Sequence, residues 1–496
     1  MPFDPLPEAP RCAVVDLGSN SVRLVVFEGR TRNPMAIFNE KAVLRLGRGL
    51  QSTGQLNPEA VAQAVTVMNR YYAIARAMRA DPFEVLATAA VRDAENGAAL
   101  IETLRERMPH VPITVVSGQQ EAELSAAGVL CGIPDADGVL ADIGGGSMEV
   151  VRLLAGQRGQ AQTTRLGVIR LAERAGGVPM RARPLVEADL AEVRWLGQGA
   201  GRDLYLVGGA WRAMARIHIA QKLYSLNMVH HYTVDKEAAR ELANAVASAP
   251  RRVLERMTAA PRRRIDDLPY AAIVLRRLLR VTNARRVVFS ANGLREGWYM
   301  RLVAEDIRRE HPLTAAAHDF ARRYGRHAGL PAALVAWTAP LFAGETAEEM
   351  RLREAACWMS DIGSHDHPEY RAEQSFLRIL RQPGIGLDHH ARAFLGLTLA
   401  LRYEAEPEAP YLVTAYQLLT PEASRRALVL GSALRLAYTL SAGTPELLAA
   451  TRVLLDGSLT LRLAEGAGVF EGESVDRRLD TLAQMMGLTA RTEMAA

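Results

Sequence analysis

One short pattern occurs twice in this chain, and it restricts the possible folds more than any other feature of the sequence. The segment VVDLGSNSVRLVV, residues 14–26, aligns without gaps with LADIGGGSMEVV, residues 140–151. The spacing is the same at three matched pairs of residues: Asp16 with Asp142, Gly18 with Gly144, and Ser21 with Ser147. Such a repeat indicates a duplicated structural unit. Each copy has the pattern of two strands joined by a tight turn, so we expect two similar α/β halves whose turns face each other across a cleft.

The residues around each copy alternate between strand-like and helix-like patterns. In the first half, short β-branched runs predict strands at 12–17, 22–27, 35–46, 83–89 and 112–116. Apolar residues at helical spacing predict helices at 58–80, 95–108 and 119–131. In the second half we expect a hairpin over 138–154 and strands at 160–166, 203–207 and 285–290. Strands alternating with helices predict the α/β class.

After about residue 310 the strand patterns fade, and Ala, Leu and Arg dominate with helical periodicity. An acidic, proline-containing stretch at 404–410 divides this part of the chain. We therefore expect α/β domains at 1–132 and 133–308, a helical domain at 309–408 and a C-terminal domain at 409–496. The region after the two α/β domains is expected to be all-α, with an α+β fold as the alternative for the last domain.

The second copy of the repeat contains the strongest candidate for anion binding. A strand ends at Asp142 and is followed by the turn Gly144, Gly145, Gly146 and Ser147. Glycines allow backbone N–H groups to approach an anion closely. Asp142 can hold a Mg²⁺ ion, and Glu149, on the same strand face as Ser147, can join that metal shell. A tight hairpin turn without a ligand is the alternative interpretation.

The first copy supplies a matching turn, in which Ser19 and Asn20 follow the acidic residue Asp16. An ordinary polar turn is the alternative when this copy is taken alone. Two phosphate-type turns that face each other are characteristic of the actin-like ATPase superfamily. The third element of that pattern is a Gly-Gly turn between strand and helix, found here at Gly208 and Gly209.

Two charged residues near these turns are candidates for chemistry. Glu121 lies at the start of a predicted helix, where a carboxylate can orient water, although a solvated helix N-terminus also favours an acidic residue. Arg92 follows a strand and can grip phosphate through paired N–H donors, with a surface ion pair as the alternative.

Composition narrows the class of protein. The net charge of +5 suits a polyanionic partner without identifying one, and we expect no nucleic-acid partner. The cysteines Cys12, Cys131 and Cys357 are too dispersed for a metal motif and indicate buried free thiols in a reducing compartment.

Residues 1–10 lack the basic start and apolar run of a signal peptide, and no apolar run is long enough to cross a membrane. We expect a cytoplasmic protein.

The first 300 residues resemble the exopolyphosphatase and guanosine pentaphosphate phosphatase family. The matching blocks occur in the family's order over roughly residues 12–300: VVDLGSNSVRLVV, LATAAVRDAENG, VVSGQQEAELSAAGV, ADIGGGSMEV, TTRLGVIRLAE and SANGLREGWYM. The C-terminal part resembles the helical extension of the longer, exopolyphosphatase-type members. The resemblance implies two duplicated actin-like (ribonuclease H-like) domains followed by a degenerate HD-like domain.

The resemblance also implies a role for each candidate residue. Glu121 falls on the general base for the attacking water. Asp142 and Glu149 fall on the acidic residues around Mg²⁺, and Asp16 on the acidic residue of the first loop. The phosphate-contacting positions fall on Ser19, Asn20, Arg92, Gly144, Gly145, Gly146 and Ser147. The implied activity is Mg²⁺-dependent release of the terminal phosphate of inorganic polyphosphate.

Other functions remain open on the same residues. The nearest is hydrolysis of pppGpp to ppGpp; more remote ones are an actin-like ATPase or kinase and a silent binder of alarmone or polyphosphate. Long family members usually pair, so a homodimer is expected.

Two positions depart from the family pattern. Gln120 stands where members often have a second Glu, which weakens a two-carboxylate mechanism. Ser360-Asp361 stands at the expected His-Asp position of the helical extension, and Ser cannot replace His as a metal ligand. We therefore expect the helical domain to have no catalysis of its own, although His318-Asp319 and His365-Asp366 occur nearby.

Overall fold

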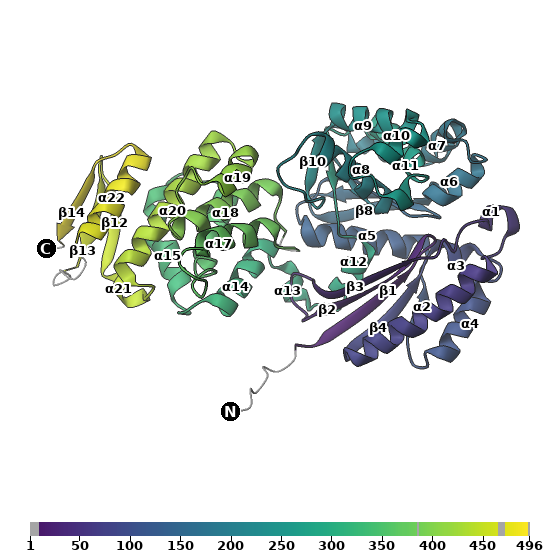
Figure 1. The fold of residues 1–496 in the computed structure, drawn as a ribbon, viewed down its shortest axis with the longest axis horizontal. Coiled ribbons are helices and arrows are strands. Elements are labelled where there is room, and N and C mark those ends of the chain that lie inside the picture. Colours follow the sequence, from purple (N-terminus) through teal and green to yellow (C-terminus); the bar gives the residue numbers. More distant parts are fainter. Residues whose placement is uncertain (1–8, 384–385, 465–471, 495–496) are drawn as a thin grey trace. The chain divides into compact units, whose positions relative to one another are not determined.

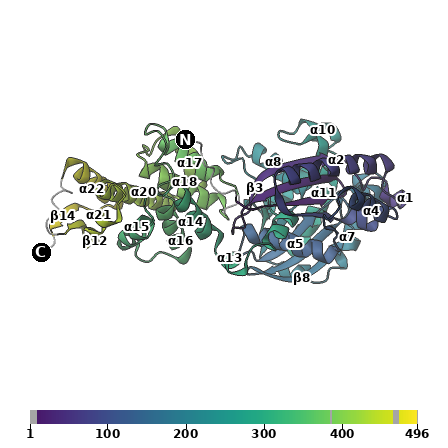
Figure 2. The same ribbon diagram turned by 90° about the horizontal axis from the view of Figure 1, so that it is seen from below.

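The computed structural model describes residues 9–383, 386–464 and 472–494. The chain forms two compact units, Met1–Arg309 and Glu310–Ala496, and Figures 1 and 2 trace both of them. No helix in the described ranges is long and apolar enough to cross a membrane.

A five-stranded sheet forms the core of the first half of unit 1. Its strands lie in the order β3-β2-β1-β4-β5. β2 pairs antiparallel with β1 and β3, whereas β1–β4 and β4–β5 are parallel. The bounds are β1 Arg11–Leu17, β2 Ser21–Glu28, β3 Met35–Val43, β4 Ala80–Ala87 and β5 Ile113–Val115.

The second sheet repeats this arrangement, which confirms the duplication predicted from the sequence. Its order is β10-β11-β9-β6-β7-β8, so β8-β7-β6-β9-β11 matches the first sheet strand for strand, with the same parallel and antiparallel pairs. The edge strand β10 is additional and was not predicted. The bounds are β6 Gly138–Ile143, β7 Met148–Leu154, β8 Gln157–Thr164, β9 Asp203–Val207, β10 Tyr232–Asp235 and β11 Arg286–Phe289.

Helices cover the sheets from outside and fill the space between them (Figure 1). α2 and α4 pack on the outer face of the first sheet, and α6 to α11 pack on the second. The remaining short helices are α1, α3 and α13. The bounds are α1 Leu50–Thr53, α2 Pro58–Ala77, α3 Ala89–Asp93, α4 Gly97–Arg107, α6 Val168–Arg174, α7 Ala182–Ala191, α8 Gly209–Gln221, α9 Lys236–Ser248, α10 Arg251–Arg256, α11 Leu268–Thr282 and α13 Glu305–Arg309.

Helix α5 (Gly118–Gly132) lies between the two sheets and carries Glu121 in its first turn. Its residue Leu124 packs with Val14 of the first sheet and with Trp298 of α12 (Leu294–Met300). Its residue Ala126 packs with Leu140 of the second sheet. Since α5 contributes to cores on both sheets, the division between domains at residue 132 stays a proposal.

Unit 2 is mainly helical and ends in a small sheet. Strands β12, β13 and β14 pair in that order, β12–β13 antiparallel and β13–β14 parallel. The last domain therefore has the α+β fold that was the alternative to an all-α one. The bounds are α14 Pro312–Tyr324, α15 Leu330–Thr338, α16 Ala347–Trp358, α17 Arg371–Arg381, α18 His389–Arg402, α19 Val413–Leu418, α20 Pro421–Ser441, α21 Pro445–Ala449, β12 Thr451–Leu455, β13 Leu459–Leu463, α22 Glu473–Met486 and β14 Ala490–Met494.

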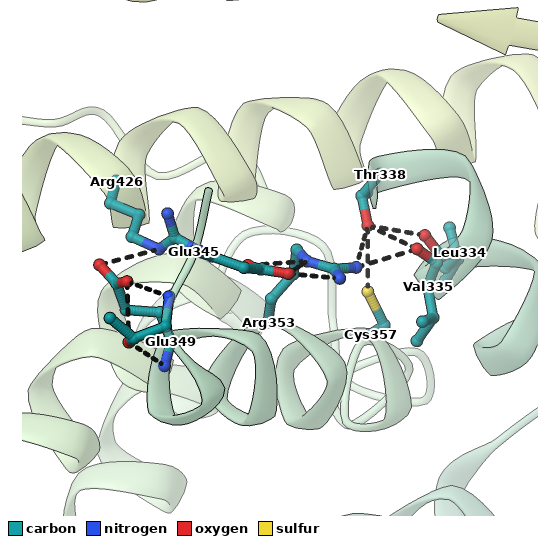
Figure 3. A network of polar contacts seen from close by, with 9 residues as sticks. Leu334, Val335, Thr338, Glu345, Glu349, Arg353, Cys357 and Arg426 are labelled. Atoms are coloured by element: carbon teal, nitrogen blue, oxygen red, sulfur yellow. Dashed lines mark hydrogen bonds and ion pairs between the residues drawn. The ribbon is translucent and has the colours of Figure 1, made fainter. Parts of the chain in front are cut away.

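A buried arginine ties three helices of unit 2 together (Figure 3). Arg353 of α16 donates to both carboxylate oxygens of Glu345 at 2.7–3.2 Å, and to the carbonyl oxygen of Val335 in α15 at 2.9 Å. Arg426 of α20 binds the same Glu345. With its charge paired and its N–H groups bonded, Arg353 can stay buried at low cost, because a buried cation needs both kinds of partner.

Ser360 and Asp361 take part in a network of hydrogen bonds between side chains of unit 2. Asp361 Oδ1 accepts from Arg326 Nη2 and from the Tyr438 hydroxyl, each at 2.9 Å. Ser360 Oγ lies 2.8 Å from the same hydroxyl. Asp361 is therefore paired with an arginine, and the expectation that the helical domain is non-catalytic stays a prediction. The three cysteines are buried and form no disulfide.

Candidate active site at the duplicated turns

The two repeated turns close in the same way. In the first, the Gly18 N–H donates to the Ser21 carbonyl oxygen at 3.1 Å. In the second, the Gly144 N–H donates to the Ser147 carbonyl oxygen at 2.9 Å. The sequence similarity therefore extends to the hydrogen bond that shapes each turn.

The turns also meet, as the sequence predicts. A Cβ atom placed on Gly146 would lie 2.8 Å from Ser19 Oγ, and one on Gly145 would lie 3.0 Å from Ser19 Cβ. Within the described residues, the backbone N–H groups of Ser19, Asn20, Gly145 and Gly146 donate no hydrogen bond. Adjacent N–H groups without an acceptor are the donor set that binds phosphate oxygens.

A buried pair of carboxylates stands behind the second turn. Asp142 and Glu149 are direct partners across β6 and β7, so their side chains lie on the same face of the sheet. Glu149 is 2% exposed, and its Oε1 has no hydrogen-bond partner. Asp142 accepts from Ser125 Oγ. Burial and the neighbouring carboxylates of Glu121 and Asp142 raise the pKa of Glu149 well above its ordinary value.

These two acids fit a hard cation, because a bound cation would compensate their buried charge and use the free Glu149 oxygen. Asp16 is placed differently. Its carboxylate Oδ2 accepts from Arg295 Nη1 at 2.9 Å. In the described part of the chain, no three His, Cys, Asp or Glu side chains gather as a preformed metal site. The metal roles of Asp16, Asp142 and Glu149 stay a proposal, which the geometry supports best for the last two.

Glu121 lies at the start of α5, within reach of Arg92. Its Oε2 accepts from Arg92 Nη1 at 3.1 Å, and that guanidinium is also bonded to the Val116 carbonyl oxygen at 2.8 Å. Burial raises the pKa of Glu121 to about 7, Arg92 opposes this rise, and the charges of Asp142 and Asp16 add to it. A carboxyl group with a pKa near neutrality can accept a proton from water and release it again.

Gln120, which the resemblance marks as a departure from the family pattern, caps the helix that carries Glu121. Its Oε1 accepts from the Ser117 N–H at 2.8 Å, and its own N–H donates to Ser117 Oγ at 3.2 Å. This reciprocal capping box begins α5 and fixes the position of Glu121 one residue later.

The third predicted turn depends on the absence of a side chain. Gly208 has φ of 119°, and a Cβ there would lie 2.3 Å from the Ile143 carbonyl oxygen. A Cβ on the next residue, Gly209, would lie 2.5 Å from Arg264 Nη2. With the Asn20 amide oxygen oriented towards Arg264, it accepts from Arg264 Nη1 at 2.8 Å. Arg264 therefore connects the first turn to the Gly-Gly turn.

The structure adds a basic cluster that sequence reasoning missed, made of Arg23, Lys41, Arg212 and Arg264. Burial and these arginines lower the pKa of Lys41 to about 7. Burial, Arg295 and Arg23 lower the pKa of Arg212 to about 10. The repeat could have drawn attention to one member of this cluster, because Arg23 in the first copy aligns with Glu149 in the second. Lys41, Arg212 and Arg264 come from distant segments and carry no shared motif.

Fold and site together define a class: a duplicated α/β protein in which two phosphate-type turns, the acidic pair Asp142 and Glu149, and the paired side chains of Arg92 and Glu121 belong to one site. The model of the Ppx/GppA phosphatase family matches residues 25–305, and that of the exopolyphosphatase C-terminal region matches residues 313–492. The chain belongs to the Ppx/GppA phosphatase family.

Curated relatives resemble part of the chain. Exopolyphosphatase 2 of Mycobacterium tuberculosis is 33% identical over 174 residues, which cover 33% of this chain and 54% of the relative. Exopolyphosphatase 1 of Mycobacterium bovis is 31% identical over 143 residues, covering 28% of this chain and 41% of the relative. The chain thus spans about half the length of the curated relatives it matches.

Solved structures show the same fold. An exopolyphosphatase from Cytophaga hutchinsonii has a TM-score of 0.54 at 21% identity, covering 59% of this chain and 99% of that one. The Aquifex aeolicus PPX-GPPA enzyme has a TM-score of 0.51 at 21% identity, again covering 59% of this chain and 99% of the other.

Proposed function

We propose that this protein is a Mg²⁺-dependent exopolyphosphatase, which hydrolyses the terminal phosphoanhydride bond of inorganic polyphosphate and releases orthophosphate. The observation that carries the proposal is the position of Glu121. This carboxyl group, with a pKa of about 7, lies in one site with Arg92, two N–H-bearing turns and a buried acidic pair. The match of residues 313–492 to the exopolyphosphatase C-terminal region favours polyphosphate over pppGpp.

In the proposed reaction, the N–H groups of the turns and Arg92 bind the oxygens of the terminal phosphoryl group. Glu121 accepts a proton from water while the water oxygen forms a bond to phosphorus. The bond from phosphorus to the bridging oxygen breaks, and that oxygen leaves on the shortened chain. Positioning and charge neutralisation provide most of the rate enhancement in such transfers.

Asp142 and Glu149 would hold Mg²⁺, which when bound neutralises charge on the phosphate oxygens. Asp16 stays a proposed member of this acidic shell. The basic cluster of Arg23, Lys41, Arg212 and Arg264 would hold the phosphates that follow the terminal one. We further propose that the protein acts in the cytoplasm as a homodimer, which light scattering of the purified protein can test.

The decisive experiment measures phosphate release with Mg²⁺ from long-chain polyphosphate and from pppGpp, for the wild type and for Glu121→Gln. We expect rapid release from polyphosphate and a loss of about 10²–10⁴-fold in the variant. Glu123→Gln is a matched control on the same helix, because Glu123 is half-buried and pairs with Arg158 on the surface rather than with Arg92.

Each other outcome has a definite meaning. Release from pppGpp alone would assign the protein to the alarmone branch of the family. Undiminished turnover in Glu121→Gln would remove Glu121 from the mechanism. Binding without release from either substrate would indicate a silent binder, and hydrolysis of ATP alone an actin-like ATPase.

A further inference from the structure

A second basic site lies on the outer face of the second α/β half. A pocket of about 630 Å³ opens between α7, α9 and α11, a size suited to a small-molecule ligand. Its lining combines six cationic side chains with one carboxylate, Glu187; the cations are Arg183, Lys236, Arg240, Arg276, Arg277 and Arg280.

The cations stand in an arrangement that is unfavourable without an anion. On α9, Lys236 and Arg240 are four residues apart, and on α11 Arg276 and Arg280 are four residues apart. Like charges at this spacing on one helix repel each other. Both pairs line the same pocket. Arg240 is paired with Glu237, and Lys236 donates to Asn283 Oδ1 at 2.6 Å, so the repulsion that an anion would relieve is chiefly the one between Arg276 and Arg280.

The single carboxylate does not neutralise this charge. Glu187 Oε1 lies 3.3 Å from Arg277 Nη1 and 3.4 Å from Arg183 Nε, so it is shared by two arginines. The buried Nε of Arg277 has no hydrogen-bond partner. In the described parts of the chain, Arg276 and Arg280 form no ion pair or hydrogen bond. Several strong donors in the pocket are thus left for a ligand.

The rest of the lining is mostly apolar, so a well-matched ligand must also carry an apolar part. Val186, Ala247, Ile273 and Leu279 are buried side chains that form part of the pocket wall, and Asn244 and Ser248 add neutral polar groups. A bare inorganic anion would leave the apolar wall uncovered. A nucleotide fits both the cationic and the apolar parts of the pocket, since its phosphates suit arginine and its flat base suits an apolar wall.

The pocket shares no residue with the candidate active site. Arg264, which contacts Asn20 there, precedes the first residue of α11, whereas the part of the pocket lining that comes from α11 and its C-cap runs from Ile273 to Asn283. At 1.5 Å per helical residue, Arg280 lies roughly 18 Å along α11 from Leu268. We propose that the pocket is a second, non-catalytic binding site for a nucleotide.

The test measures equilibrium binding of ADP to the full chain. We expect Arg276→Gln/Arg280→Gln to weaken ADP binding by about tenfold or more, because two charge-assisted contacts are lost. Arg252→Gln/Arg256→Gln is the matched control: it removes an exposed arginine pair of the same spacing from α10, outside the pocket. The control and Arg92→Gln should bind ADP as the wild type does.

Three results would overturn the proposal. One is the absence of saturable ADP binding by the wild type up to a few millimolar. A second is ADP binding that Arg92→Gln abolishes and the pocket variant retains, since the nucleotide would then occupy the candidate active site. The third is pyrophosphate binding as tightly as ADP, which would leave no role for the apolar wall. Phosphate release from polyphosphate by the pocket variant is measured separately, so failure of this proposal is distinguishable from failure of the proposed function.

Discussion

The guanidinium of Arg92 donates to the carboxylate of Glu121 at 3.1 Å, which joins the expected phosphate-binding arginine to the expected general base. Burial raises the pKa of Glu121, and Arg92 is the main group that opposes this rise. The arginine therefore lowers the pKa of the neighbouring carboxyl group towards neutrality, in addition to the phosphate-binding role that we propose for it.

This pairing predicts how the pH profile responds to loss of Arg92. A base must be ionised to act, so the rate rises with pH through the pKa of Glu121. In Arg92→Gln that pKa rises above about 7, and the acidic limb of kcat/KM for tripolyphosphate moves to higher pH. Arg105→Gln, which removes an exposed arginine paired with Glu102, should leave the limb in place. An unmoved limb in Arg92→Gln, or one at lower pH, contradicts the assignment.

The buried acidic pair predicts a pH-dependent stability. The pKa of Glu149 is raised above its usual 4.5 in the folded state, so folding retains a proton that the unfolded chain releases. Stability therefore decreases as pH rises above about 4.5. Without Mg²⁺, Glu149→Gln should have a higher Tm than the wild type at about pH 8 and a similar one at about pH 5.

The same variant also tests the proposed metal role by thermal denaturation. Added Mg²⁺ should raise the Tm of the wild type at about pH 8 by more than that of Glu149→Gln, because binding to the folded state stabilises it. A variant less stable than the wild type at about pH 8 would show that Glu149 is a satisfied structural residue.

The turn before α8 predicts a difference between two glycine substitutions. Alanine at Gly208 must adopt a positive φ and also place its Cβ 2.3 Å from a backbone oxygen. Alanine at Gly201 meets only the positive φ of 73°, with no atom within 4 Å of its Cβ. In urea unfolding we expect losses of about 3 kcal/mol for Gly208→Ala and about 1 kcal/mol for Gly201→Ala. Equal losses would mean that the contact with Ile143 relaxes freely.

The site could be predicted from the sequence where its geometry is local. The repeat fixes both turns, and the two-residue alternation of a strand places Ser147 and Glu149 on one face. The contact between Arg92 and Glu121 joins segments that only the tertiary fold brings together. Lys41, Arg212 and Arg264 gather for the same reason, with no pattern in the sequence to relate them.

The C-terminal sheet shows a similar limit. Strand β12 does alternate, with Thr451 and Val453 buried and Arg452 exposed, but it is five residues long within a helical region. Its sheet is completed by β14, which pairs parallel with β13 only after α22 has intervened. Short strands of this kind are specified by their partners more than by their own sequence.

The environment of Asp361 predicts a structural acid in unit 2. Burial raises the pKa of Asp361, but the hydrogen bonds from Arg326 and Ser364 outweigh this and lower it below its usual value. The contribution of Asp361 to the free energy of unfolding is therefore present at neutral pH and is lost as pH falls through the lowered pKa. Arg326 itself is exposed, so Asp361→Asn should cost about 1.5–3 kcal/mol at pH 7, the range expected for lost hydrogen bonds to a charged group.

Thermal denaturation with and without a chelator separates this structural role from metal binding. Asp319→Asn breaks an ion pair with the largely exposed Arg322 and should cost less than about 1 kcal/mol. The chelator should not change the Tm of either variant or of the wild type. A chelator-dependent Tm that disappears in Asp361→Asn would instead restore the metal-site interpretation of this domain.

The lowered pKa of Lys41 predicts that substrate binding takes up a proton. In the free protein this pKa is about 7, because of burial and nearby arginines, against a usual 10.5. A polyphosphate anion beside Lys41 would raise it, so tripolyphosphate binding near pH 8 draws a proton from the buffer. Affinity should therefore fall as pH rises above about 7, by up to tenfold per pH unit.

Calorimetric titration of Glu121→Gln, which we expect to turn over the ligand about 10²–10⁴-fold more slowly, measures this uptake when repeated in buffers of different ionisation enthalpy. Lys41→Met should bind tripolyphosphate more weakly and lose the proton uptake, because the titrating amine is gone. Lys222→Met is the control, since Lys222 is exposed and outside the cluster. If Lys41→Met in the Glu121→Gln background took up as many protons on ligand binding as Glu121→Gln alone, Lys41 would lie outside the path of the anion. The basic cluster would then need another role.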